Sequence, residues 1–77
     1  MKIKTFGVAK DIVGASEFEI HNVPDSVADL RQELEARFPK LAEIKSYAIA
    51  VNEEYVNDGD KVEPGDTIVI IPPVSGG

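Results

Sequence analysis

The sequence contains no cysteine, one histidine and few basic residues. Without cysteine, disulfide bonds, thiolate metal sites and cysteine nucleophiles are all excluded. The 8 lysines and arginines are outnumbered by 14 aspartates and glutamates, which gives a formal net charge of −6. This charge argues against nucleic acid as a partner, because the phosphate backbone binds to cationic surfaces. An acidic chain would suit a basic protein partner through electrostatic steering, but a net charge also keeps small domains soluble, and charge alone does not separate the two.

Long apolar runs are also missing. No stretch approaches the roughly 20 apolar residues of a membrane-spanning helix, and Met1–Lys4 leads into a strand pattern without the apolar region of a signal peptide. We therefore expect a cytoplasmic protein that does not bind a membrane. A chain of 77 residues predicts one domain that buries about 60% of its extended surface. Such a domain has little room for an enclosed active site.

The residue sets of common enzymes do not occur. There is no glycine-rich phosphate loop, no Ser-His-Asp set and no histidine cluster. His21 has no second ligand or nucleophile near it in the sequence, and we interpret it as surface at a strand edge. Six acids lie between residues 52 and 66, in apparent turns whose spacing does not fit the EF-hand calcium loop. We predict no metal site and no catalysis by this chain alone.

Apolar alternation and short apolar runs predict five strands. They are expected at residues 2–8, 17–21, 47–51, 55–56 and 67–71. In the first strand, Phe6 shares a face with two lysines and should point away from the core. The first two strands are expected to form an antiparallel hairpin. The unbroken apolar run of the last strand predicts that it is central and covered on both faces, or nearly so.

One amphipathic helix is predicted between Ser26 and Phe38. Ser26 and Asp29 have the spacing of a capping box, and Pro39 should end the helix. Its apolar stripe consists of Val27, Leu30, Leu34 and Phe38. Two charged i,i+4 pairs are expected on its solvent side: Arg31 with Glu35, and Glu33 with Arg37.

The order of these elements is a hairpin, a helix and then three more strands. This order predicts an α+β domain of the β-grasp (ubiquitin-like) type, with a mixed sheet of about five strands and one main helix packed on one face. The first and last strands would lie side by side and parallel at the centre. We assign residues 1–72 to the domain and residues 73–77 to a flexible C-terminal tail. A fold does not fix a function, so the function has to come from the site.

The tail has a distinctive composition. Pro72 and Pro73 lack N–H groups and have a fixed φ, so they end sheet pairing and stiffen the base of the tail. Gly76 and Gly77 have no Cβ, so their backbone can enter passages that other residues would block. Residues 73–77 reach about 17 Å when extended. This pattern predicts an arm that places the Gly77 carboxylate in another protein's active site.

Four motifs carry a resemblance to a known family. They are Pro72-Pro73-Val74-Ser75-Gly76-Gly77, Ala50-Val51-Asn52 followed by Tyr55-Val56, Gly65-Asp66 before the last strand, and Phe6 with Asp11-Ile12-Val13-Gly14. With them the chain resembles the MoaD family, the small sulfur-carrier subunit of molybdopterin synthase, along essentially its whole length. The ending is the most specific motif, because sister sulfur carriers share Gly-Gly but usually lack the Pro-Pro-Val lead-in. The family's ubiquitin-like fold agrees with the predicted order of elements.

The resemblance implies a sulfur-carrier cycle in molybdenum cofactor biosynthesis. A MoeB-like enzyme, related to ubiquitin activators, would use ATP to adenylate the Gly77 carboxylate, and sulfur would then displace AMP to leave a thiocarboxylate. The carrier would dock on the MoaE-like large synthase subunit and thread Gly76 and Gly77 into its active site. There the sulfur would pass to cyclic pyranopterin monophosphate. No cofactor would stay bound to this chain.

The resemblance also implies a docking surface around the tail. Its apolar positions are occupied here by Phe6, Tyr55 and Ile71, although an aliphatic residue is common where Tyr55 stands and an aromatic residue where Ile71 stands. The tail itself would contribute the residues before the glycines: Pro72, Pro73, Val74 and Ser75.

Three other functions stay open from the sequence. A thiamine-pathway sulfur carrier would use the same chemistry with a different acceptor, although the Pro-Pro-Val lead-in argues against it. A ubiquitin-like protein modifier would form isopeptide conjugates with lysines. An interaction module with an inert tail would keep its function after deletion of Gly76 and Gly77.

Overall fold

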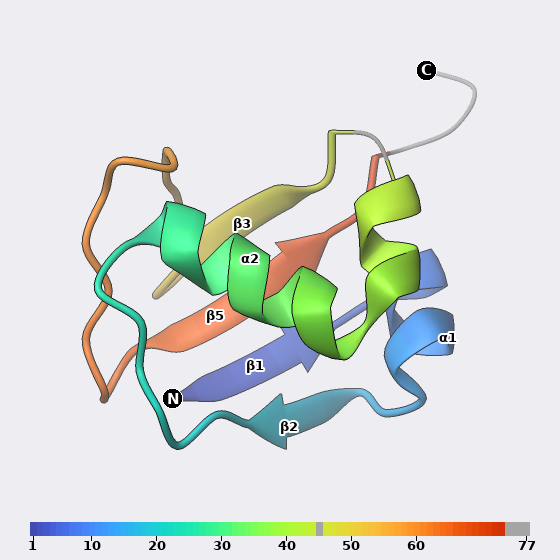
Figure 1. The fold of residues 1–77 in the computed structure, drawn as a ribbon, viewed down its shortest axis with the longest axis horizontal. Coiled ribbons are helices and arrows are strands. Elements are labelled where there is room, and N and C mark those ends of the chain that lie inside the picture. The colour runs from blue at the N-terminus through green and yellow to red at the C-terminus, as the bar shows by residue number, and fades with distance from the viewer. Residues whose placement is uncertain (45, 74–77) are drawn as a thin grey trace.

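The computed structural model describes residues 1–44 and 46–73, which form a five-stranded sheet with α2 across one face (Figure 1). The strands are β1 (Lys2–Thr5), β2 (Glu17–Glu19), β3 (Ala48–Val51), β4 (Glu54–Tyr55) and β5 (Thr67–Ile71). The helices are α1 (Gly7–Val13), α2 (Val27–Arg37) and the 3₁₀ helix η1 (Pro39–Glu43). All five predicted strands are therefore present, and the last has the predicted bounds.

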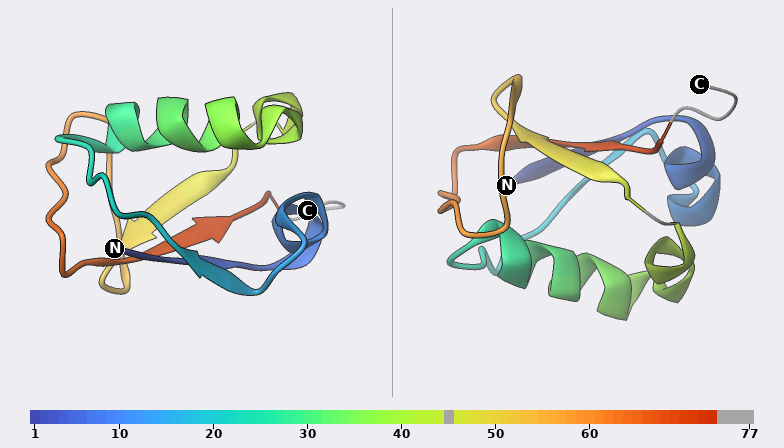
Figure 2. Two further views of the ribbon diagram at one scale, coloured as in Figure 1. Left: turned by 60° about the horizontal axis from the view of Figure 1, so that its bottom comes forward. Right: turned by 90° about the horizontal axis from the view of Figure 1, so that it is seen from above.

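The sheet has the strand order β2-β1-β5-β3-β4. The first and last strands, β1 and β5, are parallel neighbours in its middle, and the other three pairings are antiparallel. Figure 2 shows α2 on one side of the sheet, whereas no described helix covers the other side. This topology confirms the β-grasp prediction.

The core lies between α2 and the sheet. Side chains at alternate strand positions point into it, together with one stripe of α2; the fully buried ones include Ile3, Ile49, Ile68, Ile70, Val27, Leu30 and Leu34. Phe38 ends the stripe and packs edge-on against Phe18 of β2, with the ring centroids 5.5 Å apart. The predicted apolar stripe of the helix is thus its buried face.

The first strand is shorter than predicted, because the chain turns into α1 directly after Phe6. Gly7 has a φ of 55°, a left-handed value that glycine adopts at little cost. The Phe6 carbonyl then accepts hydrogen bonds from the backbone N–H groups of Ala9 and Lys10. The residues that continue the apolar alternation past Thr5 therefore belong to the start of α1 and not to the strand.

The ends of α2 agree with the prediction. The Ser26 hydroxyl oxygen accepts a hydrogen bond from the Asp29 backbone N–H over 3.2 Å, which satisfies one of the free donors at the helix start. Pro39 follows the last turn and begins η1. Glu33 and Arg37 form the expected ion pair, at 3.6 Å.

The predicted pair of Arg31 with Glu35 is wrong. Arg31 Nε donates to Asp58 Oδ1 over 2.8 Å, and Arg31 Nη1 donates to the Tyr47 carbonyl over 3.0 Å. The guanidinium also stacks on the Tyr47 ring, 4.6 Å from its centroid. The hydroxyl of this buried tyrosine needs an acceptor and donates to the Glu35 carboxylate. Arg31 and Glu35 therefore both bond to residues that are distant in the sequence, and not to each other.

This environment gives Tyr47 a stability effect at alkaline pH. Burial, and then the hydrogen bond to Glu35, raise the pKa of Tyr47 from its ordinary value of 10.0 to about 12. The folded state thus favours the neutral phenol, and this stabilisation is complete below pH 10 and is lost as the pH rises through about 12. We expect the free energy of unfolding to fall more steeply over this range in the wild type than in Tyr47→Phe. Urea denaturation at a series of pH values measures both slopes, and equal slopes would contradict the assignment.

A two-residue turn joins β3 to β4. Asn52 and Glu53 have φ values of 51° and 72°, the left-handed conformation that both central residues of a type I′ hairpin turn require. Asparagine tolerates this conformation, but the Cβ of a glutamate is crowded there. We expect Glu53→Gly to raise the free energy of unfolding by about 0.5–1 kcal/mol, measured by urea denaturation. The same change at Glu54, inside β4, should lower it, and an equal effect at both positions would exclude strain at Glu53.

Candidate functional site

The base of the C-terminal tail is fixed by the sheet. The middle strand, β5, ends at Ile71, and Pro72 and Pro73 follow it. Pro72 lies close to the start of α1. A side chain at Gly7 would contact it, since the Cβ would lie 3.4 Å from Pro72 Cγ. The tail therefore starts from a defined point at the end of the sheet. The predicted tail residues Val74–Gly77 lie outside the described residues.

An apolar surface on the open side of the sheet begins beside this point. It consists of the outward residues of β3, β4 and β5 together with Phe6, and we call it the apolar face: Phe6, Ala48, Ala50, Tyr55, Val69 and Ile71. The strand register places Ala50 between Val69 and Tyr55. The exposed fraction is 56% for Phe6 and 73% for Tyr55. Grouped exposure of large apolar side chains is typical of interaction sites.

The fold brings the three predicted docking side chains to this one face. Phe6 follows β1, whose parallel pairing with β5 puts it level with Ile71, and Tyr55 lies on the edge strand β4. The predicted central position of β5 is confirmed. The sequence also predicts that β5 is covered on both faces, or nearly so; α2 covers one face, and on the other Val69 is only half-buried. Sequence reasoning therefore missed Val69. Val8, which the sequence places in the first strand, lies in α1 and is exposed.

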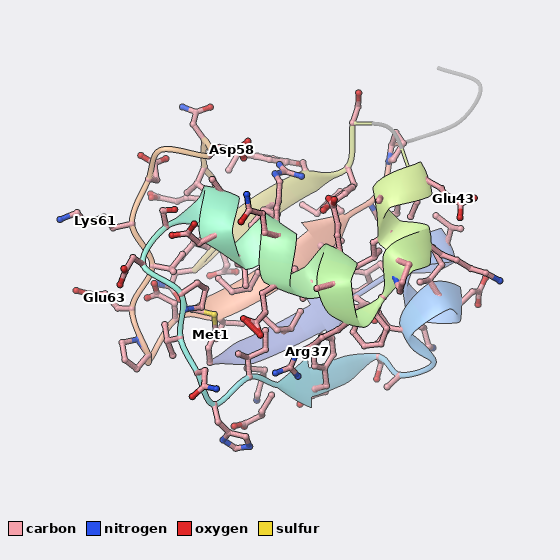
Figure 3. All side chains as sticks on the ribbon, in the orientation of Figure 1. Met1, Arg37, Glu43, Asp58, Lys61 and Glu63 are labelled. Atoms are coloured by element: carbon pink, nitrogen blue, oxygen red, sulfur yellow. The ribbon has the colours of Figure 1, made fainter. Side chains whose placement is uncertain are left out.

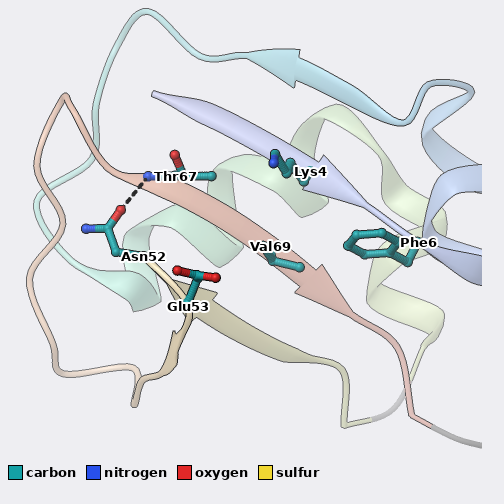
Figure 4. A pocket seen from close by; sticks show the side chains of 6 residues that line it. All are labelled: Lys4, Phe6, Asn52, Glu53, Thr67 and Val69. Atoms are coloured by element: carbon teal, nitrogen blue, oxygen red, sulfur yellow. Dashed lines mark hydrogen bonds between the residues drawn. The ribbon is translucent and has the colours of Figure 1, made fainter.

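A hollow of about 400 Å³ adjoins the apolar face (Figure 4). It is lined by Lys4, Phe6, Asn52, Glu53, Thr67 and Val69. Lys4 and Glu53 bring opposite charges to it, on either side of Val69 (Figure 4). The open face of the sheet thus combines apolar side chains with a charged border.

The acidic turns lie at the other end of the sheet. Asp58 and Glu63 project from the loop before β5, away from the tail base (Figure 3). Asp60 accepts a hydrogen bond from the Asn57 backbone N–H, and Asp66 accepts one from the Glu63 backbone N–H, each over 2.8 Å. These carboxylates stabilise turns, as the sequence predicts.

Residues 1–44 and 46–73 contain neither a metal-binding cluster nor a membrane-spanning helix. Within these ranges, no three His, Asp or Glu side chains are grouped so that they could hold a metal ion. No helix in the same ranges is long and apolar enough to cross a membrane. His21 is exposed just after β2, which agrees with its interpretation as surface.

Comparison with known proteins identifies the family. The sequence pattern of the ThiS family matches residues 3–77. The chain belongs to the ThiS family. Over 83 aligned residues, this ThiS-family chain is 37% identical to the molybdopterin synthase sulfur carrier subunit of Homo sapiens, with 100% of this chain and 93% of the human protein covered. The predicted resemblance to that group of sulfur carriers is confirmed.

Solved structures agree with this assignment. The putative molybdopterin converting factor subunit 1 from Pyrococcus furiosus is 31% identical to this ThiS-family chain, with a TM-score of 0.85 and 95% of each chain covered. A chain in the complex of subunits 1 and 2 of the molybdopterin-converting factor from Helicobacter pylori is 26% identical. Its TM-score is 0.68, and 99% of this chain and 96% of that chain are covered.

Proposed function

We propose that this chain is a cytoplasmic sulfur carrier of molybdopterin synthase and that it carries the sulfur as a thiocarboxylate on Gly77. Family membership and the full-length similarity to a named sulfur carrier subunit support the carrier role. The structural observation that carries the proposal is the position of the tail base. The middle strand ends at Ile71, at the edge of the apolar face, and six residues ending in Gly-Gly follow it.

The proposed chemistry explains why the tail needs a second enzyme. A carboxylate is a poor electrophile until it gains a good leaving group. A MoeB-like enzyme would join the Gly77 carboxylate to the AMP part of ATP, with release of pyrophosphate. A sulfur nucleophile would then attack the acyl carbon and expel AMP. The resulting thiocarboxylate is a soft nucleophile formed without cysteine, which this chain does not contain.

The apolar face would dock the carrier on a MoaE-like large subunit. Phe6, Tyr55 and Ile71 would make the apolar contacts, since they share one face beside the tail base. The H. pylori complex of subunits 1 and 2 supports a two-subunit assembly. Residues 72–75 would fill the entrance to the large subunit, and Gly76 with Gly77 would reach its active site. There the large subunit would supply the pocket and the positive charge, and cyclic pyranopterin monophosphate would receive the sulfur.

The intact mass of the chain tests this proposal. We expect co-expression with a MoeB-like enzyme to give a species in which one oxygen of Gly77 is replaced by sulfur. If the sulfur donor is withheld, an acyl-adenylate at the same carboxylate should accumulate. An unmodified carboxylate under both conditions would contradict the carrier function and favour an interaction module. Lysine conjugates in place of the thiocarboxylate would favour a protein modifier.

A further inference from the structure

Glu53 has an unfavourable backbone conformation and an exposed carboxylate. Its φ of 72° lies in the region where glycine is preferred. Within the described part of the chain, its carboxylate has neither a hydrogen-bond partner nor an ion-pair partner. Strained residues of this kind are often found at binding sites, so the question is what the side chain contacts when the protein is bound.

A set of hydrogen bonds fixes the position of Glu53. The backbone N–H of the preceding Asn52 donates to the Thr67 carbonyl over 2.9 Å, and Asn52 Oδ1 accepts from the Thr67 N–H over 3.0 Å. Asn52 Nδ2 donates to Asp66 Oδ1 over 2.9 Å, and Asp66 also anchors the turn at Glu63. The Asn52 and Gly65-Asp66 motifs are thus two halves of one clip. This clip holds the β3–β4 turn against the start of β5.

The clip places Glu53 at the border of the apolar face. Glu53 lines the same hollow as Phe6 and Val69, and Figure 4 shows its carboxylate beside Val69. Tyr55 lies two residues further on, in β4. Phe6 and Val69 belong both to the apolar face and to the lining of this hollow, so a protein docked on that face would cover the side of the hollow that they form. It would therefore meet the Glu53 carboxylate, on a chain whose formal net charge is −6.

We propose that Glu53 is a specificity contact of the docking surface and accepts a charge-assisted hydrogen bond from a lysine or arginine of the large subunit. This inference rests on the proposed function, because it needs a large subunit docked on the apolar face. Since the position favours glycine, the Cβ of Glu53 lowers the stability of the free carrier. What the carboxylate contributes is complementarity to a basic partner, which favours the correct partner and speeds encounter.

The test measures the affinity of variants for the purified large synthase subunit of the same organism, by isothermal titration calorimetry at low and high salt. We expect Glu53→Gln to weaken binding about 2–5-fold, and Glu53→Lys to weaken it about tenfold or more through like-charge repulsion. Glu53→Gly should weaken binding as much as Glu53→Gln while it raises the melting temperature. The affinity of the wild type should also fall more with added salt than that of Glu53→Gln.

Glu54 provides matched controls, because it is exposed and adjacent but occupies the alternate position of β4, opposite Val51. We expect Glu54→Gln and Glu54→Lys to change affinity by less than about twofold. Equal losses of affinity at Glu53 and Glu54 would mean that only the net charge of the chain matters, and would overturn the inference. If Lys4→Gln weakened binding as much as Glu53→Gln does, the Glu53 carboxylate would instead act through an ion pair with Lys4 of its own chain. Failure of the wild type to bind the large subunit would contradict the proposed function itself.

Discussion

Removal of Gly76 and Gly77 is expected to abolish thiocarboxylate formation and sulfur transfer while the melting temperature stays unchanged. The loss should be complete, because the shortened chain ends in a carboxylate on Ser75 with about 7 Å less reach and without the slim glycine backbone. The fold should be unaffected, since β5 ends at Ile71, before the deleted residues. Intact mass after co-expression, molybdopterin formation in a reconstituted synthase and a thermal melt measure the three quantities.

A milder tail variant and a control variant accompany the deletion. Gly76→Ala keeps the length of the tail but adds a Cβ, so we expect slower sulfur transfer with almost no change in stability. His21→Ala changes an exposed side chain outside the proposed machinery and should retain wild-type activity. Sulfur transfer at the wild-type rate by the truncated chain would disprove the carrier mechanism.

Ile68→Ala and Ile71→Ala are expected to separate stability from docking within one strand. Ile68 is fully buried between the sheet and α2, so its truncation should cost about 2–5 kcal/mol. That is a large part of the roughly 4–12 kcal/mol expected for a domain of this size. Ile71 is only half-buried on the open face, so the same truncation should cost less than about 1.5 kcal/mol. Urea denaturation measures both free energies of unfolding.

The losses of binding affinity of Ile68→Ala and Ile71→Ala should have the opposite order to their losses of stability. Because Ile71 belongs to the apolar face, we expect Ile71→Ala to weaken binding to the large subunit at least about fivefold. Folded Ile68→Ala should bind with the wild-type affinity. If Ile71→Ala bound normally and lost as much stability as Ile68→Ala, the division of β5 into a core side and a docking side would be wrong.

Most of the fold could be predicted because its signals are local. Alternation identified Ile3 as inward, and helical spacing identified Leu30 and Leu34 as the buried stripe of α2. The cap at Ser26 depends on a residue three positions away. The end of β1 was the exception, because the left-handed φ of Gly7 leaves no mark on the apolar pattern.

The site could be predicted in part. The Gly-Gly tail came from the residues themselves, whereas the docking roles of Phe6, Tyr55 and Ile71 came from the resemblance to the MoaD family and remain predictions. The partial exposure of Val69 could not be predicted, since an unbroken apolar run looks the same whether one face of a strand is covered or both. The docking role of Glu53 also had no sequence signal, because an acid in a turn is usually only a solvated side chain.

The β-grasp order of elements, the buried stripe of α2 and the Gly-Gly ending can be read from the chain alone, because each depends on residue types a few positions apart. Which charged and polar groups meet depends instead on the packing of the folded chain. Arg31 pairs with Asp58, 27 residues away, instead of Glu35, and Asn52 holds Asp66, 14 residues away. Such partners are set by how the sheet and α2 pack, and a short polar side chain bonds to whichever group packing brings within about 3 Å.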